Sequence, residues 1–142
     1  MITGVAIVLM AVFLSLSLVH VYWLLGGRAG QLVAIPERDG KPVFQPSAVA
    51  TLVVALVLAL CAILIAATGG LLALPLPDRV LLWLTRTLAL GLLLRAIGDF
   101  RLVGFFKRIR DTRFARLDTA VYSPLCLVLA VGSAIVGFGR QG

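Results

Sequence analysis

Four long apolar stretches dominate this chain of 142 residues. An α-helix rises about 1.5 Å per residue, so roughly 20 apolar residues cross the hydrocarbon core of a bilayer, which is about 30 Å thick. Each stretch reaches that length, and the expected spans lie near 2–25, 48–68, 80–106 and 120–138. We therefore predict an all-α integral membrane protein: a single domain over residues 1–142, built as a four-helix transmembrane bundle.

The composition excludes a water-soluble domain. Hydrophobic residues make up 61% of the chain and charged residues 13%, whereas apolar residues form about half of a typical soluble domain. The formal net charge is +7, but no basic segment is long enough to fold around a nucleic-acid duplex. The sequence thus predicts the lipid bilayer as a partner and no nucleic acid.

The basic residues predict the orientation of the spans, because Lys and Arg are enriched in cytoplasmic loops of membrane proteins. Three of them lie between the first two spans and five between the last two, against one in the 69–79 loop and one at the C-terminus. We therefore expect a multi-pass protein with both termini facing outward and the two basic loops in the cytoplasm.

The loop between the first two spans contains a turn signal. Asp39-Gly40 lies between two short extended runs, a pattern typical of a β-hairpin. Pro36, Pro42 and Pro46 keep any strands short. We expect a short hairpin-like cytoplasmic loop, which is either a stiff connector or a lid over the end of the bundle.

The third predicted span contains charges that a bilayer penalises by about 2.5–3.5 kcal/mol each on insertion scales. Arg95 and Asp99 are four residues apart, so on a helix they share a face and can pair. Such a pair would be structural. If Asp99 bonds elsewhere, the free donors of Arg95 favour a carboxylate or phosphate ligand. Arg86 belongs to another face and is expected to snorkel outward.

His20, the only histidine, shares a helix face with Trp23 near the cytoplasmic end of the first span. Its expected depth matches that of Asp99. It can make a hydrogen bond to Asp99 or to a backbone carbonyl, or it can bind a ligand or carry a proton. A lone His is a poor transition-metal site, so no metal is predicted and the cofactor stays unassigned.

Asp118 and Tyr122 open the fourth predicted span at the same membrane face. Both can close a pocket, and for Asp118 we expect a helix cap. No catalytic residues are assigned. The candidate ligand-binding residues are His20, Trp23, Arg95, Asp99 and Tyr122.

Four segments also carry a family resemblance: His20-Val-Tyr-Trp-Leu-Leu-Gly-Gly27, Pro36 through Pro46, Arg95-Ala-Ile-Gly-Asp-Phe-Arg-Leu-Val-Gly-Phe-Phe-Lys107, and Phe114-Ala-Arg-Leu-Asp-Thr-Ala-Val-Tyr-Ser-Pro124. On these segments the chain resembles a family of small bacterial four-span membrane proteins known only as a domain of unknown function. The resemblance implies four spans and supplies no activity. Together with the charge pattern, it places the chain in a bacterial inner (cytoplasmic) membrane.

Three functions fit these features. The leading expectation is a non-catalytic binding or transport module that holds a small anionic or amphipathic ligand, or a lipid headgroup, in a polar pocket near the cytoplasmic leaflet. Arg95 would supply the charge, Asp99 and Tyr122 would orient the ligand, Trp23 would pack, and His20 would respond to pH. One alternative is a structural subunit of a larger membrane complex. The other is a membrane enzyme acting on a lipid or isoprenoid, with His20 or Asp99 as general acid or base. The oligomeric state stays open.

Overall fold

The computed structural model describes residues 1–39 and 41–140, and within them four long helices correspond to the four predicted spans, with different bounds for the third and the fourth. They are α1 (Ile2–Leu24), α2 (Ala48–Thr68), α3 (Asp78–Ile97) and a composite helix over Arg113–Gly139. Each is long and apolar enough to cross a membrane. The chain is therefore an all-helical protein of the multi-pass membrane class.

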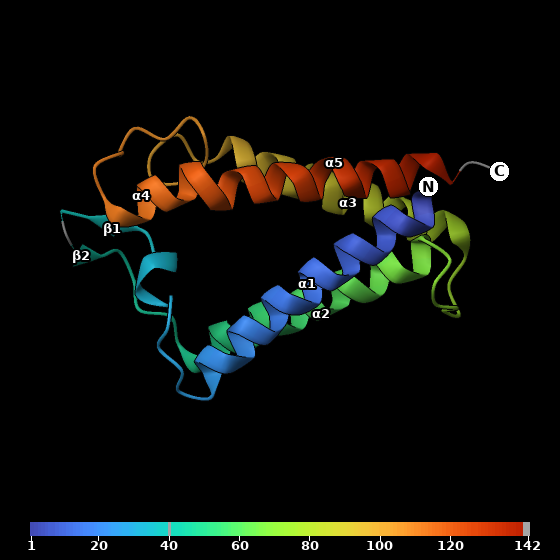
Figure 1. The fold of residues 1–142 in the computed structure, drawn as a ribbon, viewed down its shortest axis with the longest axis horizontal. Coiled ribbons are helices and arrows are strands. Elements are labelled where there is room, and N and C mark those ends of the chain that lie inside the picture. Colours follow the sequence, from blue (N-terminus) through green and yellow to red (C-terminus); the bar gives the residue numbers. More distant parts are fainter. Residues whose placement is uncertain (40, 141–142) are drawn as a thin grey trace.

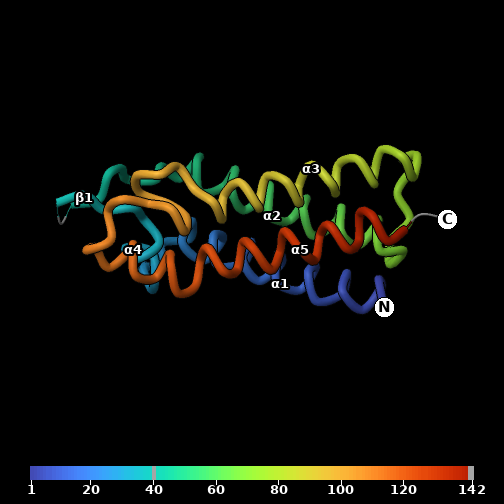
Figure 2. The backbone as a smooth tube through the Cα atoms, turned by 90° about the horizontal axis from the view of Figure 1, so that it is seen from above, coloured from blue at the N-terminus to red at the C-terminus, as the bar shows by residue number. Residues whose placement is uncertain are grey.

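The helices form two antiparallel pairs (Figure 1). α1 packs mainly against α2, and α3 packs mainly against α5 (Ser123–Gly139). The two pairs meet near the chain termini and diverge toward the opposite end (Figure 1). Figure 2 shows the helices running along one long axis, with the connections 25–47 and 98–112 gathered away from the termini. These ends are termed the terminal end and the loop end.

The apolar core that joins the pairs consists of Ala6, Leu9, Phe13, Ala62, Ile65, Leu129 and Val136. Close approach between helices depends on small residues: a Cβ added at Gly132 of α5 would lie 2.8 Å from Leu9 Cδ2. In lipid, close packing of this kind, rather than the hydrophobic effect, holds helices together. Only 22% of the apolar stretch in each of the first three spans is buried inside the protein, so most of these side chains face outward.

Polar contacts fasten the terminal end. Arg140 Nη1 donates hydrogen bonds to the carbonyl oxygens of Ala67 and Thr68, at 3.1 and 2.8 Å. These carbonyls belong to the last turn of α2, which has no intrahelical donors for them. The buried hydroxyls of Thr68 and Thr85 lie 2.8 Å apart and join α2 to α3. The pairs are thus tied at this end by side chains as well as by apolar packing.

The first connection contains the expected hairpin. β1 (Glu37–Arg38) and β2 (Lys41–Pro42) pair antiparallel, and Asp39 takes a positive φ of 53° in the turn. Gly40, the second residue of the predicted turn, lies outside the described residues. β1 contacts α4 (Arg113–Leu117), and the short 3₁₀ helix η1 (Leu32–Ala34) also contacts α4. The hairpin therefore lies against the start of the fourth span.

The third span is shorter than predicted. α3 ends at Ile97 rather than near residue 106, and residues 98–112 form a loop. Gly98 and Gly104 both have positive φ, 95° and 91°. Their backbones lie so close together that a Cβ on either residue would collide with backbone atoms at the other. The reversal at these two glycines is what ends the helix.

The fourth span begins earlier than predicted, at Arg113. The Thr112 side chain caps it by accepting a hydrogen bond from the Ala115 N–H at 3.1 Å. The expectation that Asp118 caps this helix was therefore wrong. Asp118 lies five residues after the first residue of this helix, Arg113, and its side chain is fully buried.

A π-helical turn, η2 (Asp118–Tyr122), joins α4 to α5. Its wide bond runs from the Ser123 N–H to the Asp118 carbonyl. Pro124 follows at once and has no N–H, so it cannot continue the α-helical ladder to Ala120. One extra residue in the turn rotates the preceding segment by about 100° relative to α5. This rotation changes the face on which Asp118 lies.

Candidate functional site

Three charged side chains meet where α3 ends and the fourth span begins. Asp118 Oδ1 accepts a hydrogen bond from Arg95 Nη2 at 2.9 Å, and Asp118 Oδ2 accepts one from Lys107 Nζ at 3.0 Å. The Gly104 N–H also donates to Oδ2, at 2.8 Å. The side chains of Asp118 and Lys107 are 0% exposed, and that of Arg95 is 36% exposed. Arg95, Lys107 and Asp118 are termed the Asp118 cluster.

The Asp118 cluster fastens the 98–107 loop to both spans. Lys107 Nζ donates also to the Gly104 carbonyl at 2.9 Å and to Thr119 Oγ1 at 2.6 Å, so all three of its protons are used. Two cations face one carboxylate, which leaves the cluster net positive. Within the described part of the chain, Arg95 Nη1 is buried and has no hydrogen-bond partner.

Asp99 pairs with neither Arg95 nor His20, the two partners that the sequence left open for it. Because α3 ends before it, Asp99 no longer shares a helix face with Arg95. Its Oδ1 instead accepts hydrogen bonds from the N–H groups of Arg101, Leu102 and Val103, at 2.9, 2.8 and 3.0 Å. Desolvation acts to raise the pKa of Asp99, but these bonds outweigh it, so the pKa lies below its ordinary value.

His20 makes its hydrogen bond within its own helix. Nδ1 lies 2.8 Å from the Leu16 carbonyl oxygen. A carbonyl only accepts, so in the neutral ring Nδ1 carries the proton and Nε2 is left as an acceptor. The edge of the His20 ring meets Trp23 at a centroid distance of 4.9 Å. Trp23 is fixed in turn, because its Nε1 donates to the Ala29 carbonyl at 2.8 Å.

A cavity of about 190 Å³ opens beside these two rings, between α1, α2 and the first connection. It is termed the His20 pocket. The described residues that line it include no Asp, Glu, Lys or Arg, and their polar side chains are His20, Gln31 and Thr51. The Thr51 hydroxyl already bonds to the Ser47 carbonyl at 3.0 Å. The apolar part of the lining includes Trp23, Ile35, Phe44, Pro46 and Val54.

Tyr122 ties the fourth span to the wall of the His20 pocket. Its hydroxyl donates to the Val33 carbonyl of η1 at 3.3 Å, and its ring packs near Phe114 at a centroid distance of 6.0 Å. The next two residues after Val33, Ala34 and Ile35, line the pocket. Tyr122 therefore stabilises the wall formed by Ala34 and Ile35 without lining the pocket itself.

All five candidate residues lie at the loop end, but the structure does not bring all of them into one pocket. His20 and Trp23 line the His20 pocket, whereas Arg95, Asp99 and Tyr122 are not among its lining residues. Arg95 belongs to the Asp118 cluster. The described residues also contain no group of three or more His, Cys, Asp or Glu side chains placed to hold a metal ion.

Sequence reasoning missed Lys107 and the role of Asp118. Lys107 stands first in a run of basic residues, and nothing in that run distinguishes the one side chain that becomes buried. For Asp118 a signal did exist: a carboxylate that enters an apolar helix needs a cation or several N–H donors. Two of its three partners, Lys107 and the Gly104 N–H, reach Asp118 only through the path of the 98–112 loop, which the sequence pattern does not reveal.

The fold and this site together define a small four-span helical membrane protein with a buried ion cluster and a separate pocket at the same end. The comparison with family models gives the relationship: the chain belongs to the family described as "Protein of unknown function (DUF3995)", whose model matches residues 13–133. The resemblance to a family known only as a domain of unknown function is thereby confirmed. No curated protein and no solved structure shows a significant match to the chain.

Proposed function

We propose that this protein is a non-catalytic membrane module that binds or transports a small anionic or amphipathic molecule at the loop end, in the His20 pocket. The observation that carries the proposal is a preformed cavity whose largely apolar walls adjoin an unused polar atom, His20 Nε2. Ligand sites typically combine apolar walls with a few placed polar groups. The volume of about 190 Å³ is below the roughly 300–1,000 Å³ typical of ligand sites, so the pocket suits a very small molecule or one arm of a larger one.

The chemistry of His20 sets what the pocket prefers. The neutral ring accepts a hydrogen bond at Nε2, for instance from a hydroxyl, whereas the protonated ring donates one to a carboxylate or phosphate. Since the lining has no other charged group, binding of an anion should strengthen as His20 becomes protonated. Trp23 supports selectivity because its hydrogen bond to Ala29 gives the pocket a rigid aromatic wall.

The other three candidate residues support the pocket from outside it. Tyr122 holds η1, which contributes to the wall, and Asp99 orders the loop after α3. Arg95 supplies positive charge to the Asp118 cluster, and its side chain is 36% exposed, so an anionic headgroup at the loop end can approach it. A ligand with an apolar body and one acidic group suits both the apolar walls of the His20 pocket and the positive charge at the loop end.

We further propose that the loop end faces the cytoplasm of a bacterial inner membrane, with both termini outside. The support is the clustering of basic residues at the loop end, which is the arrangement that the positive-inside rule describes. The proposed binding site then draws its ligand from the cytoplasm or the inner leaflet.

Native mass spectrometry of protein released from mild detergent tests the binding proposal. The wild type should carry a reproducible adduct, and His20→Ala should lose it. Ser15→Ala is the matched control, because Ser15 is an exposed residue of α1 bonded only to the Ala11 carbonyl, and it should retain the adduct. Arg95→Leu should insert normally but lose an anionic adduct.

Two results would overturn the proposal. One is an adduct of equal occupancy in wild type and His20→Ala. The other is a wild-type protein that is free of any adduct but co-purifies with a fixed partner, which would establish the structural-subunit function instead. That alternative draws on the Asp118 cluster, since its carboxylate is fully used inside the protein.

A further inference from the structure

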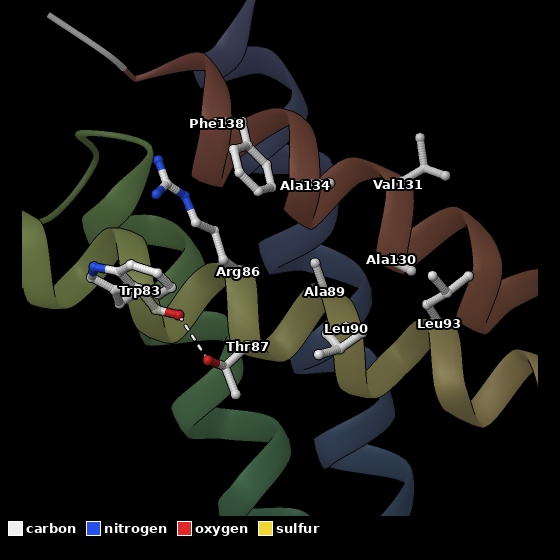
Figure 3. A pocket seen from close by; sticks show the side chains of 10 residues that line it. All are labelled: Trp83, Arg86, Thr87, Ala89, Leu90, Leu93, Ala130, Val131, Ala134 and Phe138. Atoms are coloured by element: carbon white, nitrogen blue, oxygen red, sulfur yellow. Dashed lines mark hydrogen bonds between the residues drawn. The ribbon is translucent and has the colours of Figure 1, made fainter.

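A larger hollow lies between α3 and α5 (Figure 3), and it shares no lining residue with the His20 pocket. Its volume is about 530 Å³, within the range of roughly 300–1,000 Å³ that is typical of ligand sites. Alanines at 89, 130 and 134 leave space between the two helices (Figure 3). Among the described residues that line it, Arg86 provides the only charged side chain. This hollow is termed the Arg86 groove.

The guanidinium of Arg86 is held in place by three contacts. Its Nε donates to the Gly137 carbonyl at 2.9 Å. Its Cζ lies 4.4 Å from the ring centroid of Phe138 and 5.7 Å from that of Trp83. Gly137 belongs to the last turn of α5, where carbonyls have no intrahelical donor. Arg86 thus caps α5, but the cap uses Nε alone.

The position of this guanidinium suits the level of lipid headgroups. The Arg86 backbone lies about 12 Å along α3 from Asp78, at 1.5 Å per residue. Its side chain, however, extends toward the C-terminal end of α5 (Figure 3). Its partner Gly137 lies only about 3 Å along the axis from the helix end at Gly139. Arg86 therefore snorkels from the apolar depth to the terminal end, carrying its charge with it.

The charge of Arg86 has no protein counter-ion in the described part of the chain. The ion pairs found there do not include it, and its two Nη groups make no hydrogen bond among these residues. The negative end of the α5 dipole compensates only a part of a full charge. The phosphate of a lipid headgroup can balance the charge of Arg86 at the terminal end, and the apolar side chains of the adjacent groove can contact an acyl chain of the same lipid.

We propose that the Arg86 groove is a binding site for a membrane phospholipid, with an acyl chain along the alanines and the phosphate against the Nη groups of Arg86. Guanidinium groups bind phosphate oxygens through paired N–H donors. The lipid is drawn from the leaflet at the terminal end. The site is independent of the His20 pocket, since it lies on the other helix pair and takes its ligand at the other end.

The test is native mass spectrometry of the purified full chain after incubation with phosphatidylglycerol in mild detergent. The wild type should retain one phospholipid. Ala134→Leu, which fills the groove without touching the charge, and Arg86→Met, which removes it, should each lower the affinity about tenfold or more. Ala11→Leu adds the same volume to an exposed position of α1 and should bind as the wild type does.

Two truncated probes separate the contribution of the acyl chain from that of the phosphate. Glycerol phosphate, which has no acyl chain, and monoacylglycerol, which has no phosphate, should both bind at least about tenfold more weakly than phosphatidylglycerol. His20→Ala should retain the phospholipid, so the two proposals fail separately. If Arg86→Met does not fold, phospholipid binding by Ala134→Leu still tests the proposal. Equal retention by Ala134→Leu and wild type would overturn the proposal, as would equal binding of either truncated probe.

Discussion

At the scale of single residues, Asp118 has the most demanding environment. Its carboxylate is 0% exposed and accepts bonds from two cations and one backbone N–H. Breaking a buried ion pair from one side is strongly destabilising because it leaves a charge that is neither solvated nor paired. The main contribution of Asp118 to stability is therefore that its carboxylate pairs with the buried ammonium group of Lys107.

Replacing Asp118 by Asn should lower the free energy of unfolding by about 3–5 kcal/mol. The measurement is chemical denaturation in detergent micelles. Asp111→Asn is the control, since Asp111 is exposed, and it should change little. The double variant Asp118→Leu with Lys107→Met should recover part of the loss, because apolar replacement of a buried pair is often neutral, whereas Arg95 and the Gly104 N–H still lose their acceptor. A double variant as unstable as Asp118→Asn would contradict this prediction.

Asp99 gives a pH-dependent prediction at the same scale. Its folded pKa is lower than its ordinary value of 3.8, so its contribution to loop stability is fully present above about that pH and is lost as pH falls through the lower, folded pKa. Hydrogen exchange should show protection of the Arg101, Leu102 and Val103 amides disappearing over this acid range. In Asp99→Asn the protection should be weaker and should lack the acid step. An unchanged step in that variant would show that another group is responsible.

At the scale of elements, the spans and the loop between them follow from different kinds of information. Apolar length alone predicts α1 and α2 closely, because a bilayer requires about 20 apolar residues per helix. It extends the third span too far, since Leu102, Val103 and Phe105 are apolar but follow a reversal at Gly98. The π-helical turn at 118–122 likewise has no periodic signal, only Pro124 after it. The candidate site depends on this loop and this turn. The sequence therefore predicted that the site lies at the loop end, but it did not predict which residues bond to Asp118.

The reversal of the 98–104 loop predicts opposite effects for two glycines. In Gly104→Ala the new Cβ would collide with the Ile97 carbonyl and the Gly98 backbone at a positive φ, at an expected cost of about 1–3 kcal/mol. Gly91 lies in α3 with open space around it, so Gly91→Ala should be neutral or stabilise by up to about 1 kcal/mol. Thermal unfolding of both variants in detergent gives the comparison. Similar destabilisation by the two substitutions would rule out the loop geometry as the cause.

At the scale of the whole molecule, the two ends differ in charge and in packing. The terminal end is closed by the core and by Arg140, which caps α2. Toward the loop end the helix pairs diverge, and the connections that bridge them carry most of the basic residues (Figure 1). This asymmetry underlies the proposed orientation, with the His20 pocket toward the cytoplasm and the Arg86 groove toward the outside.

The orientation is measured by labelling single introduced cysteines with a membrane-impermeant maleimide. Leu72→Cys, in the exposed 69–77 connection at the terminal end, should be labelled on intact cells. Asp39→Cys, in the hairpin turn, should be labelled only after lysis. Because Cys61 and Cys126 lie within spans, the unmodified protein serves as the background control. The reverse pattern would place the basic loops outside and refute the assignment.

The central claim, that the His20 pocket holds a ligand through Nε2, is tested most directly by ¹⁵N NMR of the imidazole. The chain has one histidine, so selective labelling of tag-free protein gives a single ring. Protein that retains its adduct would be compared with the same protein after exhaustive detergent exchange. The Nδ1 resonance should stay that of a protonated nitrogen bonded to the Leu16 carbonyl, and the Nε2 resonance should shift between the two samples. An Nε2 resonance that is identical with and without the adduct would contradict the claim.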